Sequence, residues 1–402
     1  MGMSKRETAP QSVTILGSTG SVGCSTIDLI VRNREQFTIE ALTANRNVDL
    51  LIEQARRLRP KFVAIGDAAH FNALKSGLSG RKIEVAAGAD AVVEAARRPA
   101  EFVMAAIVGS AGLFPTLAAI QRGARIGLAN KECLVCAGDL MVAEIRRHKA
   151  VLLPVDSEHN AIFQVFDFER REAVDRLILT ASGGPFASLS LKEMRNVTPA
   201  QAVKHPNWDM GAKISVDSAT MMNKGLEIIE AHYLFDMPEP RIEVLVHRQS
   251  VVHSLVVYRD GSVLAQLGTP DMRTPIAYAL AWPGRMAVPQ AKLDLAALGN
   301  LTFEAPDPVR FPALRLAREA LKNGKSAPTV LSAANEIAVA GFLSGRIGFL
   351  DIADIVEDVL SQFDHRHFAS LDDVRDCDLS ARRIAQSVLE GWPARSFAGT
   401  GA

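Results

Sequence analysis

The chain has 402 residues, 22% of them charged and 48% hydrophobic, and its 45 basic and 45 acidic residues give a formal net charge of zero. This length allows two or three domains with separate cores. Without a basic excess, the composition argues against nucleic-acid and anionic-membrane partners, although it allows a local anion site. The most apolar stretch, residues 102–120, is interrupted by Gly109, Gly112 and Pro115, which argues against a transmembrane span. We expect a globular, cytoplasmic protein.

The cysteines are four in number and scattered along the chain, which is too few for a disulfide scaffold. Cys133 and Cys136 form a C-x-x-C pair, but a zinc ribbon needs a second such pair and the chain has none. A thioredoxin-like site is the alternative. The apolar neighbours favour two small buried side chains on a helix.

A glycine-rich loop follows the first predicted strand, Val13–Gly17. The loop reads GSTGSVG, or G-x-x-G-x-x-G, and leads into an amphipathic helical pattern. The dinucleotide-binding fingerprint has its first glycine one place later, where this chain has Ser18. Small residues still let backbone N–H groups approach a pyrophosphate, and the helix start favours its charge. The loop therefore predicts a dinucleotide site.

The next predicted strand, Thr38–Thr43, is followed by Ala44-Asn45-Arg46-Asn47. A site that prefers NAD usually has an acid here to hold the ribose hydroxyls. This chain has none, and the Arg46 guanidinium suits a 2′-phosphate, so we expect NADP(H). The alternative for Arg46 is an ordinary exposed loop cation.

Further strand-like runs alternate with helical patterns, which predicts a mainly parallel sheet with helices on both faces. Ligands bind such sheets at the carboxyl ends of the strands. Two strands end in polar triplets, Asn130-Lys131-Glu132 and Asp156-Ser157-Glu158. The strand-like runs are Lys61–Ile65, Phe102–Val108, Arg125–Ala129 and Val151–Val155.

Asp156 and Glu158 are two residues apart, so on an extended segment their carboxylates face the same side. Two carboxylates so close repel each other unless a cation or a proton lies between them, and oxygen ligands suit a hard divalent cation. Because D-x-E triplets are common, the alternative is a solvated pair of carboxylates. The position of this triplet at the end of a Rossmann-type strand favours the metal site.

A second small-residue turn follows the predicted strand Leu177–Thr180. Ser182, Gly183 and Gly184 offer a hydroxyl and accessible backbone N–H groups, which suit a phosphate; the alternative is a plain turn. The stretch that follows, through HPNWDMG, predicts a mobile lid that carries Trp208 and excludes water from a polar ligand.

The stretch Ser215–Glu230, SVDSATMMNKGLEIIE, predicts one helix that Ser218 caps. Asn223, Lys224 and Glu227 are three and four positions apart, so their side chains point the same way. An amide, an ammonium and a carboxylate at one place suit a phosphorylated substrate beside a metal ion. The alternative is a solvated helix face with a Lys–Glu pair.

The remaining chain predicts a β region, a proline-rich linker and a helical bundle. The β region, Arg241–His247, Ser250–Tyr258 and Ser262–Leu267, contains a hairpin signal at Asp260-Gly261 and is a candidate dimer surface. Residues 270–312 are weakly patterned. Helical patterns cover Leu314–Lys322, Val330–Leu343, Ile352–Phe363 and Leu379–Glu390.

Together these features predict an α/β fold with four segments. The segments are an N-terminal Rossmann-like, doubly wound NADPH domain (1–155), a central α+β catalytic, metal-binding and dimerisation domain (156–280) with a flap at 182–212, a linker (281–311), and a C-terminal α-helical bundle (312–402).

Seven motifs occur in this order: GSTGSVG, LANKE, VDSEHNAIFQ, SGGPF, HPNW, SVDSATMMNKGLE and PDMRTP. Each is modest, but the ordered set resembles the 1-deoxy-D-xylulose 5-phosphate reductoisomerase family over nearly the whole chain. The resemblance implies an NADPH-dependent enzyme of non-mevalonate isoprenoid biosynthesis that requires a divalent metal and forms a homodimer. Family members commonly carry Gly-Lys-Asn where this chain has Asn45-Arg46-Asn47; the cation is kept.

The resemblance also implies roles for particular residues. Asp156, Glu158 and Glu227 would bind Mg²⁺, Mn²⁺ or Co²⁺. The phosphate of the substrate would be held by Ser182, Ser218, Asn223 and Lys224. The rest of the substrate would contact Lys131, Ser157, Glu158, His205 and Glu227, with Trp208 covering it from the flap. The cofactor would contact Thr19, Gly20, Ser21, Val22, Asn45, Arg46, Asn47, Asn130, Glu132 and Gly211.

The reaction that the resemblance implies has two stages. The metal would act as a Lewis acid while the carbon skeleton of the sugar phosphate breaks and rejoins, giving 2-C-methyl-D-erythrose 4-phosphate. NADPH would then reduce this aldehyde to 2-C-methyl-D-erythritol 4-phosphate. Glu158, Lys131 and a metal-bound water are the candidates for proton transfer.

Two rival functions are compatible with parts of the sequence. A simple NADP-dependent dehydrogenase of a phosphorylated hydroxy acid or aldehyde needs the glycine loop but not three converging carboxylates. The other rival is a non-catalytic redox sensor that binds NADPH without oxidising it on a substrate. Such a sensor would not need the motifs SGGPF, HPNW and SVDSATMMNKGLE together.

Overall fold

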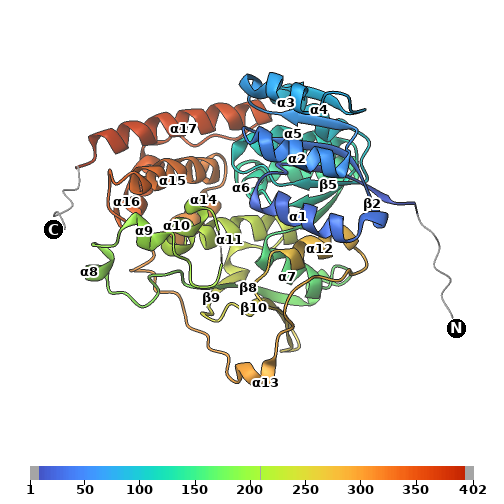
Figure 1. Ribbon diagram of the computed structural model, residues 1–402. Coiled ribbons are helices and arrows are strands. Elements are labelled where there is room, and N and C mark those ends of the chain that lie inside the picture. Colours follow the sequence, from blue (N-terminus) through green and yellow to red (C-terminus); the bar gives the residue numbers. More distant parts are fainter. Residues whose placement is uncertain (1–8, 209, 394–402) are drawn as a thin grey trace, which may run out of the picture. The chain divides into compact units, whose positions relative to one another are not determined.

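The computed structural model describes residues 9–208 and 210–393. Contact clustering separates the chain into two compact units. The first contains the described residues of 1–130, 141–156 and 272–289, and the second those of 131–140, 157–271 and 290–402. Figure 1 shows the elements of both units, coloured along the sequence. The division into four segments stays a prediction.

The first unit is built on a parallel sheet of seven strands. The strand order is β4-β3-β2-β1-β5-β6-β7, so the direction of winding reverses between β1 and β5. Ligands bind parallel sheets at such a switch point, at the carboxyl ends of the strands. The Rossmann-like expectation is confirmed. The strands are β1 (Gln11–Leu16), β2 (Phe37–Ala44), β3 (Phe62–Ile65), β4 (Glu84–Ala87), β5 (Phe102–Ala105), β6 (Arg125–Leu128) and β7 (Val151–Pro154).

Burial explains which of these strands the sequence pattern reveals. The strands β3 and β5 are short apolar runs that are buried at every position, as expected for strands covered on both faces. The edge strand β4 was not predicted, because Glu84 is exposed and the other three residues are only partly buried. Helices of this unit are α1 (Ser21–Arg32), α2 (Val48–Leu58), α3 (Phe71–Gly77), α4 (Ala89–Arg97), α5 (Leu113–Gln121) and α12 (Arg273–Ala281).

Helix α12 lies at the start of the proline-rich stretch from 270 to 312, which was predicted to be a linker. The helix packs against α1 and against β6 and β7. Pro275 is its third residue, in the first turn, where the missing N–H costs little because it has no partner within the helix. A proline in this stretch is therefore compatible with a helix start.

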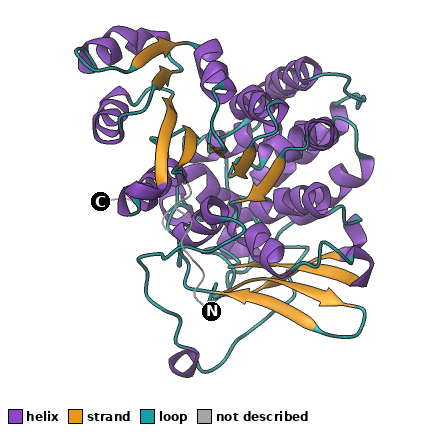
Figure 2. Cartoon of the chain, turned by 90° about the vertical axis from the view of Figure 1, so that its right-hand side faces the viewer, coloured by secondary structure: helices purple, strands orange, loops and turns teal. Residues whose placement is uncertain are grey.

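The second unit contains a mixed sheet of four strands in the order β11-β10-β8-β9. Strands β8 and β9 are parallel and the other pairs antiparallel; Figure 2 shows its strands (orange) lying side by side. The predicted hairpin between β10 and β11 is confirmed, with Gly261 at φ +87° in its turn. The strands are β8 (Val174–Ala181), β9 (Ile242–Val246), β10 (Val252–Tyr258) and β11 (Val263–Leu267).

Two helices of this unit carry the residues of interest for function. Helix α7 (Ser157–Val165) packs against β10 and β11, and helix α11 (Met222–Phe235) packs against α14. Residues 215–230 were predicted as one helix capped by Ser218, and this is wrong. Helix α10 (Ala212–Thr220) ends before α11 begins, and Met221 between them has φ +62°. Ser218 lies in the last turn of α10 instead of capping α11.

The predicted helical bundle is confirmed. Helix α15 packs against α14, α16 and α17 and is buried at most positions, so it forms the centre of the bundle. Among the described residues, no helix is both long and apolar enough to cross a membrane. The bundle helices are α14 (Ala313–Asn323), α15 (Ala327–Leu343), α16 (Asp351–Gln362) and α17 (Leu371–Gly391), and the short helices elsewhere are α8 (Leu191–Met194), α9 (Pro199–Ala202) and α13 (Leu295–Leu298).

Helix α6 (Glu132–His148) has an interruption at Ala137, which has non-helical backbone angles. The chain passes from the second unit to the first just beyond it, at residues 140 and 141. Cys133 and Cys136 lie on this helix, and both side chains are buried. Burial raises the pKa of Cys136 well above its ordinary value, which suits a packed residue and not a reactive thiolate.

Candidate active site and cofactor-binding edge

In the first unit, the loop after β1 requires glycine at two positions. Gly17 has φ +82°, and a Cβ there would lie 2.7 Å from the Ala106 carbonyl oxygen. A Cβ on Gly23 would lie 2.3 Å from the Gly17 carbonyl oxygen. The N-cap of α1 is Gly20, so no side chain caps the N–H groups of the first turn. Such a helix start suits the charge of a pyrophosphate.

Ser18, which replaces the first glycine of the usual fingerprint, is a structural residue. It is fully buried, its hydroxyl donates to Gln54 Oε1 at 2.7 Å, and its carbonyl oxygen accepts from Gln54 Nε2 at 3.0 Å. Its backbone N–H donates to the Thr43 carbonyl oxygen at 2.7 Å. These bonds tie the loop to β2 and α2, which is why a serine is tolerated here.

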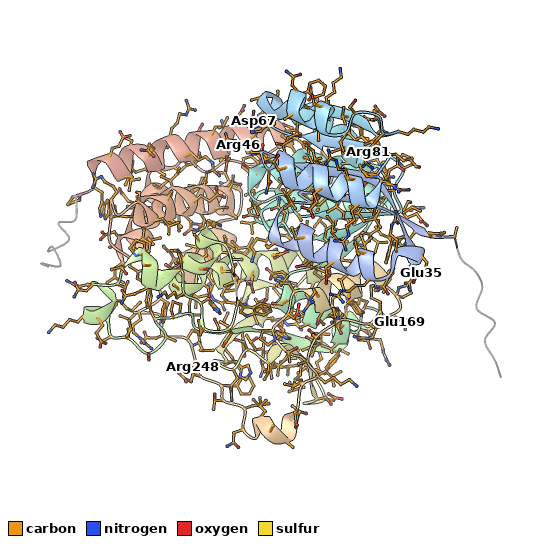
Figure 3. All side chains as sticks on the ribbon, in the orientation of Figure 1. Glu35, Arg46, Asp67, Arg81, Glu169 and Arg248 are labelled. Atoms are coloured by element: carbon orange, nitrogen blue, oxygen red, sulfur yellow. The ribbon has the colours of Figure 1, made fainter. Side chains whose placement is uncertain are left out.

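The loop after β2 carries the predicted 2′-phosphate cation. Arg46 is 76% exposed, and its Nε lies 3.2 Å from Asp67 Oδ2; Figure 3 labels both residues. The backbone N–H of Ala69, and then the cations nearby, lower the pKa of the Asp67 carboxyl. Asn47 Oδ1 accepts from the Leu50 N–H at 3.3 Å and caps α2. Asn47 therefore has a structural role besides the predicted cofactor contact.

The carboxyl-end edge of the seven-stranded sheet, which we call the cofactor edge, holds most of the predicted cofactor residues. The buried Asn130, after β6, donates from Nδ2 to the Gly109 carbonyl oxygen at 3.1 Å. Glu132 and Gly211 belong to the second unit. The residues at the edge are Thr19, Gly20, Ser21, Val22, Asn45, Arg46, Asn47 and Asn130.

Three carboxylates, which we call the acidic cluster, converge around the starts of α7 and α11. They belong to Asp156, Glu158 and Glu227, and one oxygen of each lies within 4.8 Å of the other two. Asp156 is the residue at which the chain passes into the second unit. The expectation that Asp156 and Glu158 lie on an extended segment is wrong, since α7 begins at Ser157. The turn of the helix start still leaves both carboxylates in one cluster.

Two lysines and an amide accompany the acidic cluster. Lys224 Nζ lies 2.8 Å from Glu158 Oε1 and also contacts the Glu227 carboxylate. Lys131 Nζ donates to Asn223 Oδ1 at 2.7 Å and lies 3.5 Å from Glu227 Oε1. Asn223 Nδ2 donates to Glu227 Oε1 at 2.5 Å. The predicted convergence of Asn223, Lys224 and Glu227 is confirmed.

Burial excludes the solvated-face alternative for this part of α11. Glu227 is 0% exposed and Lys224 4% exposed, so the Lys–Glu pair exists but does not face solvent. Burial alone would lower the pKa of Lys224, but the carboxylates of Glu158 and Glu227 outweigh it and raise the pKa. Lys224 is therefore an ammonium paired with carboxylates on two helices, of which that of Glu227 is buried.

The acidic cluster fits a divalent cation. Oxygen ligands bound to one such ion at about 2.0–2.6 Å lie at most about 5 Å from one another, which agrees with the 4.8 Å limit. The Lys224 ammonium contacts both Glu158 and Glu227, so a divalent ion bound by these carboxylates would take over from it as their counter-charge. Asp156, Glu158 and Glu227 would hold the metal with hard oxygen ligands.

The Ser182 hydroxyl is oriented by His205. His205 Nδ1 accepts from the backbone N–H groups of Asn207 at 3.2 Å and Trp208 at 3.0 Å. The proton of a neutral ring is therefore on Nε2, which lies 2.8 Å from Ser182 Oγ and donates to it. Burial lowers the pKa of His205, in agreement with a neutral ring. Since Ser182 Oγ also accepts from the Gly184 N–H at 3.2 Å, its own proton is directed to a further acceptor.

The Ser182 turn lies directly beside the end of α10. Gly184 has φ +66°, and a Cβ there would lie 2.8 Å from the Ser218 carbonyl oxygen, so only glycine lets the two segments approach so closely. Ser218 is three residues before Met221, whose left-handed backbone turns the chain into α11 with Asn223 and Lys224 in its first turn. The structure thus brings the segments with the predicted phosphate residues together.

The predicted flap is only partly described. Trp208 lies with its ring centroid 6.2 Å from that of His253, while Asp209 lies outside the described residues. Within the flap range, Ser190 and Thr198 form capping boxes for α8 and α9. The mobility of the flap stays a prediction.

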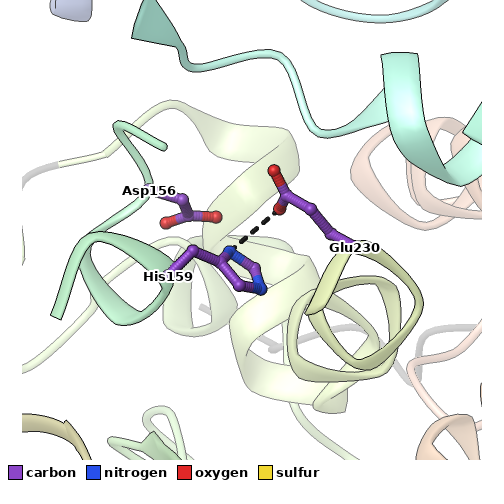
Figure 4. A group of neighbouring side chains, drawn as sticks. All are labelled: Asp156, His159 and Glu230. Carbon is purple, nitrogen blue, oxygen red and sulfur yellow. Dashed lines mark ion pairs between the residues drawn. The ribbon is translucent and has the colours of Figure 1, made fainter. Parts of the chain in front are cut away.

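Sequence reasoning missed several buried polar residues around these helices. His159 and Glu230 form an ion pair of 3.0 Å beside Asp156 (Figure 4). Asp217, next to Ser218, accepts from Asn335 Nδ2 at 2.7 Å and pairs with Lys213 at 2.8 Å. These residues are far apart in sequence or lie within apolar helical patterns, so only the position of His159 next to Glu158 was a usable signal.

Family models for 1-deoxy-D-xylulose 5-phosphate reductoisomerase match three stretches of the chain. The model with that description matches residues 13–138. The model described as its C-terminal domain matches residues 152–235, and the model described as the DXP reductoisomerase C-terminal domain matches residues 267–384. The matched stretches cover most of the chain.

Full-length relatives agree with the family models. A 1-deoxy-D-xylulose 5-phosphate reductoisomerase of Rhodospirillum centenum is 64% identical, covering 94% of each chain. The Zymomonas mobilis enzyme in complex with NADPH has a solved structure with a TM-score of 0.91 and 55% identity, covering 95% of this chain and 100% of that one. A DOX-P reductoisomerase in complex with NADPH, fosmidomycin and magnesium has a TM-score of 0.89 and 44% identity, covering 94% and 98%.

Proposed function

Because the chain belongs to the 1-deoxy-D-xylulose 5-phosphate reductoisomerase family, we propose that it converts 1-deoxy-D-xylulose 5-phosphate to 2-C-methyl-D-erythritol 4-phosphate. The reductant is NADPH and the reaction requires a divalent metal, as the solved relatives with NADPH and magnesium support. The observation that carries the proposal is the acidic cluster of Asp156, Glu158 and Glu227, with one oxygen of each within 4.8 Å of the others. A simple dehydrogenase does not need this cluster.

The second unit supplies the groups that bind the substrate. Ser182, Ser218, Asn223 and Lys224 hold the phosphate, since they lie on segments packed against one another. The neutral His205 ring donates to Ser182 Oγ and thereby directs the serine proton to a phosphate oxygen. Binding energy from this phosphate, remote from the reacting carbons, orients the substrate.

The reacting end of the substrate lies at the acidic cluster. The metal supplies Lewis-acid stabilisation of the charge that develops on the ketone and aldehyde oxygens, and NADPH supplies the hydride. Lys131 lies at this end with its ammonium 3.5 Å from Glu227, and Ser157 donates to Glu158 Oε2 at 2.5 Å. Lys131 and Glu158 are the protein groups placed to move protons there, and Trp208 excludes water from the flap side.

NADPH binds at the cofactor edge of the first unit. The loop Thr19–Val22 and the start of α1 present backbone N–H groups to the pyrophosphate. Arg46 binds the 2′-phosphate, because it is exposed and the strand before it is followed by no acid. Asn45, Asn47, Asn130, Glu132 and Gly211 complete the set of cofactor contacts.

The chain also forms a homodimer through the four-stranded sheet, in this proposal. The sheet carries exposed apolar side chains on β11, with Val263 51% exposed and Leu264 48% exposed, on an edge strand that a partner can cover. Sedimentation of the purified protein tests this, and Leu264→Glu should shift a dimer to monomer. A wild-type monomer at micromolar concentration would refute it. The cytoplasmic location expected from the sequence stays a prediction.

An absorbance assay at the nicotinamide band tests the function. With 1-deoxy-D-xylulose 5-phosphate and Mn²⁺ or Mg²⁺, NADPH should be consumed, and a chelator should abolish the consumption. Consumption that a chelator leaves unchanged would favour a simple dehydrogenase. NADPH binding without substrate-dependent oxidation would favour a redox sensor.

A further inference from the structure

A buried pair of side chains, His159 and Glu230, lies next to the acidic cluster. His159 follows Glu158 on α7, and Glu230 follows Glu227 by three residues on α11. His159 is 0% exposed and Glu230 1% exposed, and His159 Nδ1 lies 3.0 Å from Glu230 Oε2 (Figure 4). The reaction described above gives neither residue a role. Burying two ionisable side chains carries a desolvation cost, so their presence calls for an explanation.

The second nitrogen of the His159 ring makes a contact of a different kind. His159 Nε2 lies 2.9 Å from the backbone carbonyl oxygen of Glu227. A carbonyl oxygen can only accept, so Nε2 carries a proton and donates to it. The His159 ring thus contacts two groups on α11: the backbone carbonyl oxygen of Glu227 and the carboxylate of Glu230, which lies about one turn further along the helix.

These contacts place the His159 ring as a brace between the two helices that carry the acidic cluster. His159 is the neighbour of Glu158 in sequence on α7, and its Nε2 donates to the backbone carbonyl oxygen of Glu227 on α11. The Glu230 carboxylate fixes the ring in this orientation. The separation between the Glu158 and Glu227 carboxylates therefore depends on the ring.

We propose that His159, held by Glu230, is a positioning residue that sets the spacing of Glu158 and Glu227 for the divalent cation. This inference rests on the proposed function, because it takes these two carboxylates as metal ligands. Metal sites need their ligand atoms held within about 0.5 Å, and loss of a residue that orients ligands typically costs 10–100-fold in metal affinity. His159 and Glu230 themselves stay outside the ligand set.

A rival reading makes the pair part of a second metal site. One ligand atom each of Asp156, His159 and Glu230 also lies within 4.8 Å of the others, and Asp156 is common to both groups. The contact between Nε2 and Glu227 is the kind that metal-bound histidines make with their second nitrogen. The number of ions bound per chain separates the two readings.

The test measures Mn²⁺ binding to the purified protein by the EPR signal of free Mn²⁺, without substrate or NADPH. Wild type should bind one ion per chain. His159→Phe, which keeps the ring volume and removes both nitrogens, should weaken Mn²⁺ binding by about 10–100-fold with NADPH affinity unchanged. His159→Gln, which keeps one amide donor for the Glu227 carbonyl, should recover most of the loss, and a purely volumetric role would not give this rescue.

His232→Phe is the matched control. This histidine lies on α11, the helix of Glu227 and Glu230, and its Nδ1 lies 2.7 Å from a backbone carbonyl oxygen, that of Met237. It should leave Mn²⁺ affinity unchanged. Glu230→Gln should weaken Mn²⁺ binding less than His159→Phe, and it tests the brace even if the phenylalanine variant does not fold.

Two results would overturn the proposal: Mn²⁺ affinity within twofold of wild type in every folded variant among His159→Phe and Glu230→Gln, or two ions bound to wild type of which one is lost in the variants. Failure of the proposed function would look different, since wild type itself would then bind no Mn²⁺ or show no metal-dependent NADPH consumption.

Discussion

The cofactor edge of the first unit presents mainly backbone N–H groups and one exposed guanidinium, whereas in the acidic cluster the carboxylates of Glu158 and the buried Glu227 are paired with Lys224. At the loop after β1, glycines at 17 and 23 are required by close backbone approach. At α7 and α11, the 0% exposed Glu227 is in contact with Lys224 and Asn223.

This difference implies different sensitivities to mutation. A buried charge that loses its partner is costly because it cannot be compensated by water. An exposed charge such as that of Arg46 is screened and can be removed without harming the fold. Substitutions in the acidic cluster should therefore reduce turnover most. At the cofactor edge, some substitutions should lower the stability of the fold, and others should change only the affinity for NADPH.

The largest expected effect is that of Glu227→Gln. The substitution removes one ligand charge and keeps the side-chain volume, so turnover should fall by about 100-fold or more, with Mn²⁺ affinity reduced as well. Steady-state kinetics over a range of Mn²⁺ concentrations measures both. Wild-type turnover and metal affinity in this variant would show that Glu227 is not a ligand.

A smaller but still large effect is expected for Gly23→Ala in the cofactor loop. The new Cβ would lie 2.3 Å from the Gly17 carbonyl oxygen, so the loop must shift, which should cost about 1–3 kcal/mol in the free energy of unfolding and weaken NADPH binding. The control is Gly20→Ala, whose Cβ would lie 3.5 Å from the same oxygen and should leave stability nearly unchanged. Urea denaturation and NADPH titration test the pair, and equal stability of the two variants would contradict the close-approach argument.

Arg46→Ala should change cofactor selectivity and leave the fold intact. The lost charge-assisted contact to the 2′-phosphate should weaken NADPH binding by about tenfold, since such bonds contribute about 1.5–3 kcal/mol, while NADH binding stays the same. Fluorescence titration with both cofactors is the measurement. The interpretation of Arg46 as an ordinary loop cation predicts an unchanged preference.

The smallest effect concerns the pH dependence of stability through His205. Burial lowers its pKa below the ordinary 6.5, so the unfolded chain binds this proton more readily than the folded chain. Its contribution to stability is therefore full above about pH 6.5 and is lost as the pH falls through the folded pKa, with a slope of at most about 1.4 kcal/mol per pH unit. His205→Gln should lose stability less steeply between pH 7 and pH 5, as measured by urea denaturation. An identical slope in both proteins would remove His205 from this role.

The sequence pattern predicted the fold where burial is uniform and failed where local signals conflict. The fully buried strands β3 and β5 are apolar runs that pattern alone identifies, but the part-exposed β4 has no such signature. Met221 ends α10 in a left-handed conformation that usually requires glycine, so nothing in the sequence marked the break. The prolines between residues 270 and 312 suggested a linker, although Pro275 lies in the first turn of a helix.

The candidate site could be predicted only in part from the residues themselves. Spacing placed Asn223, Lys224 and Glu227 on one helix edge, and the contacts agree. That this edge meets Glu158, 66 positions from Lys224, follows from tertiary packing, and the sequence indicated it only through the family resemblance. Buried partners such as Glu230 and Asn335 have no local signal, because their roles depend on residues brought together by folding.

The most direct test of the acidic cluster is anomalous diffraction from crystals of the protein soaked in Mn²⁺. The account predicts a single strong anomalous peak bounded by carboxylate oxygens of Asp156, Glu158 and Glu227 at the usual distances of about 2.0–2.6 Å. A peak bound by other residues, or well-ordered carboxylates with no peak between them, would contradict it.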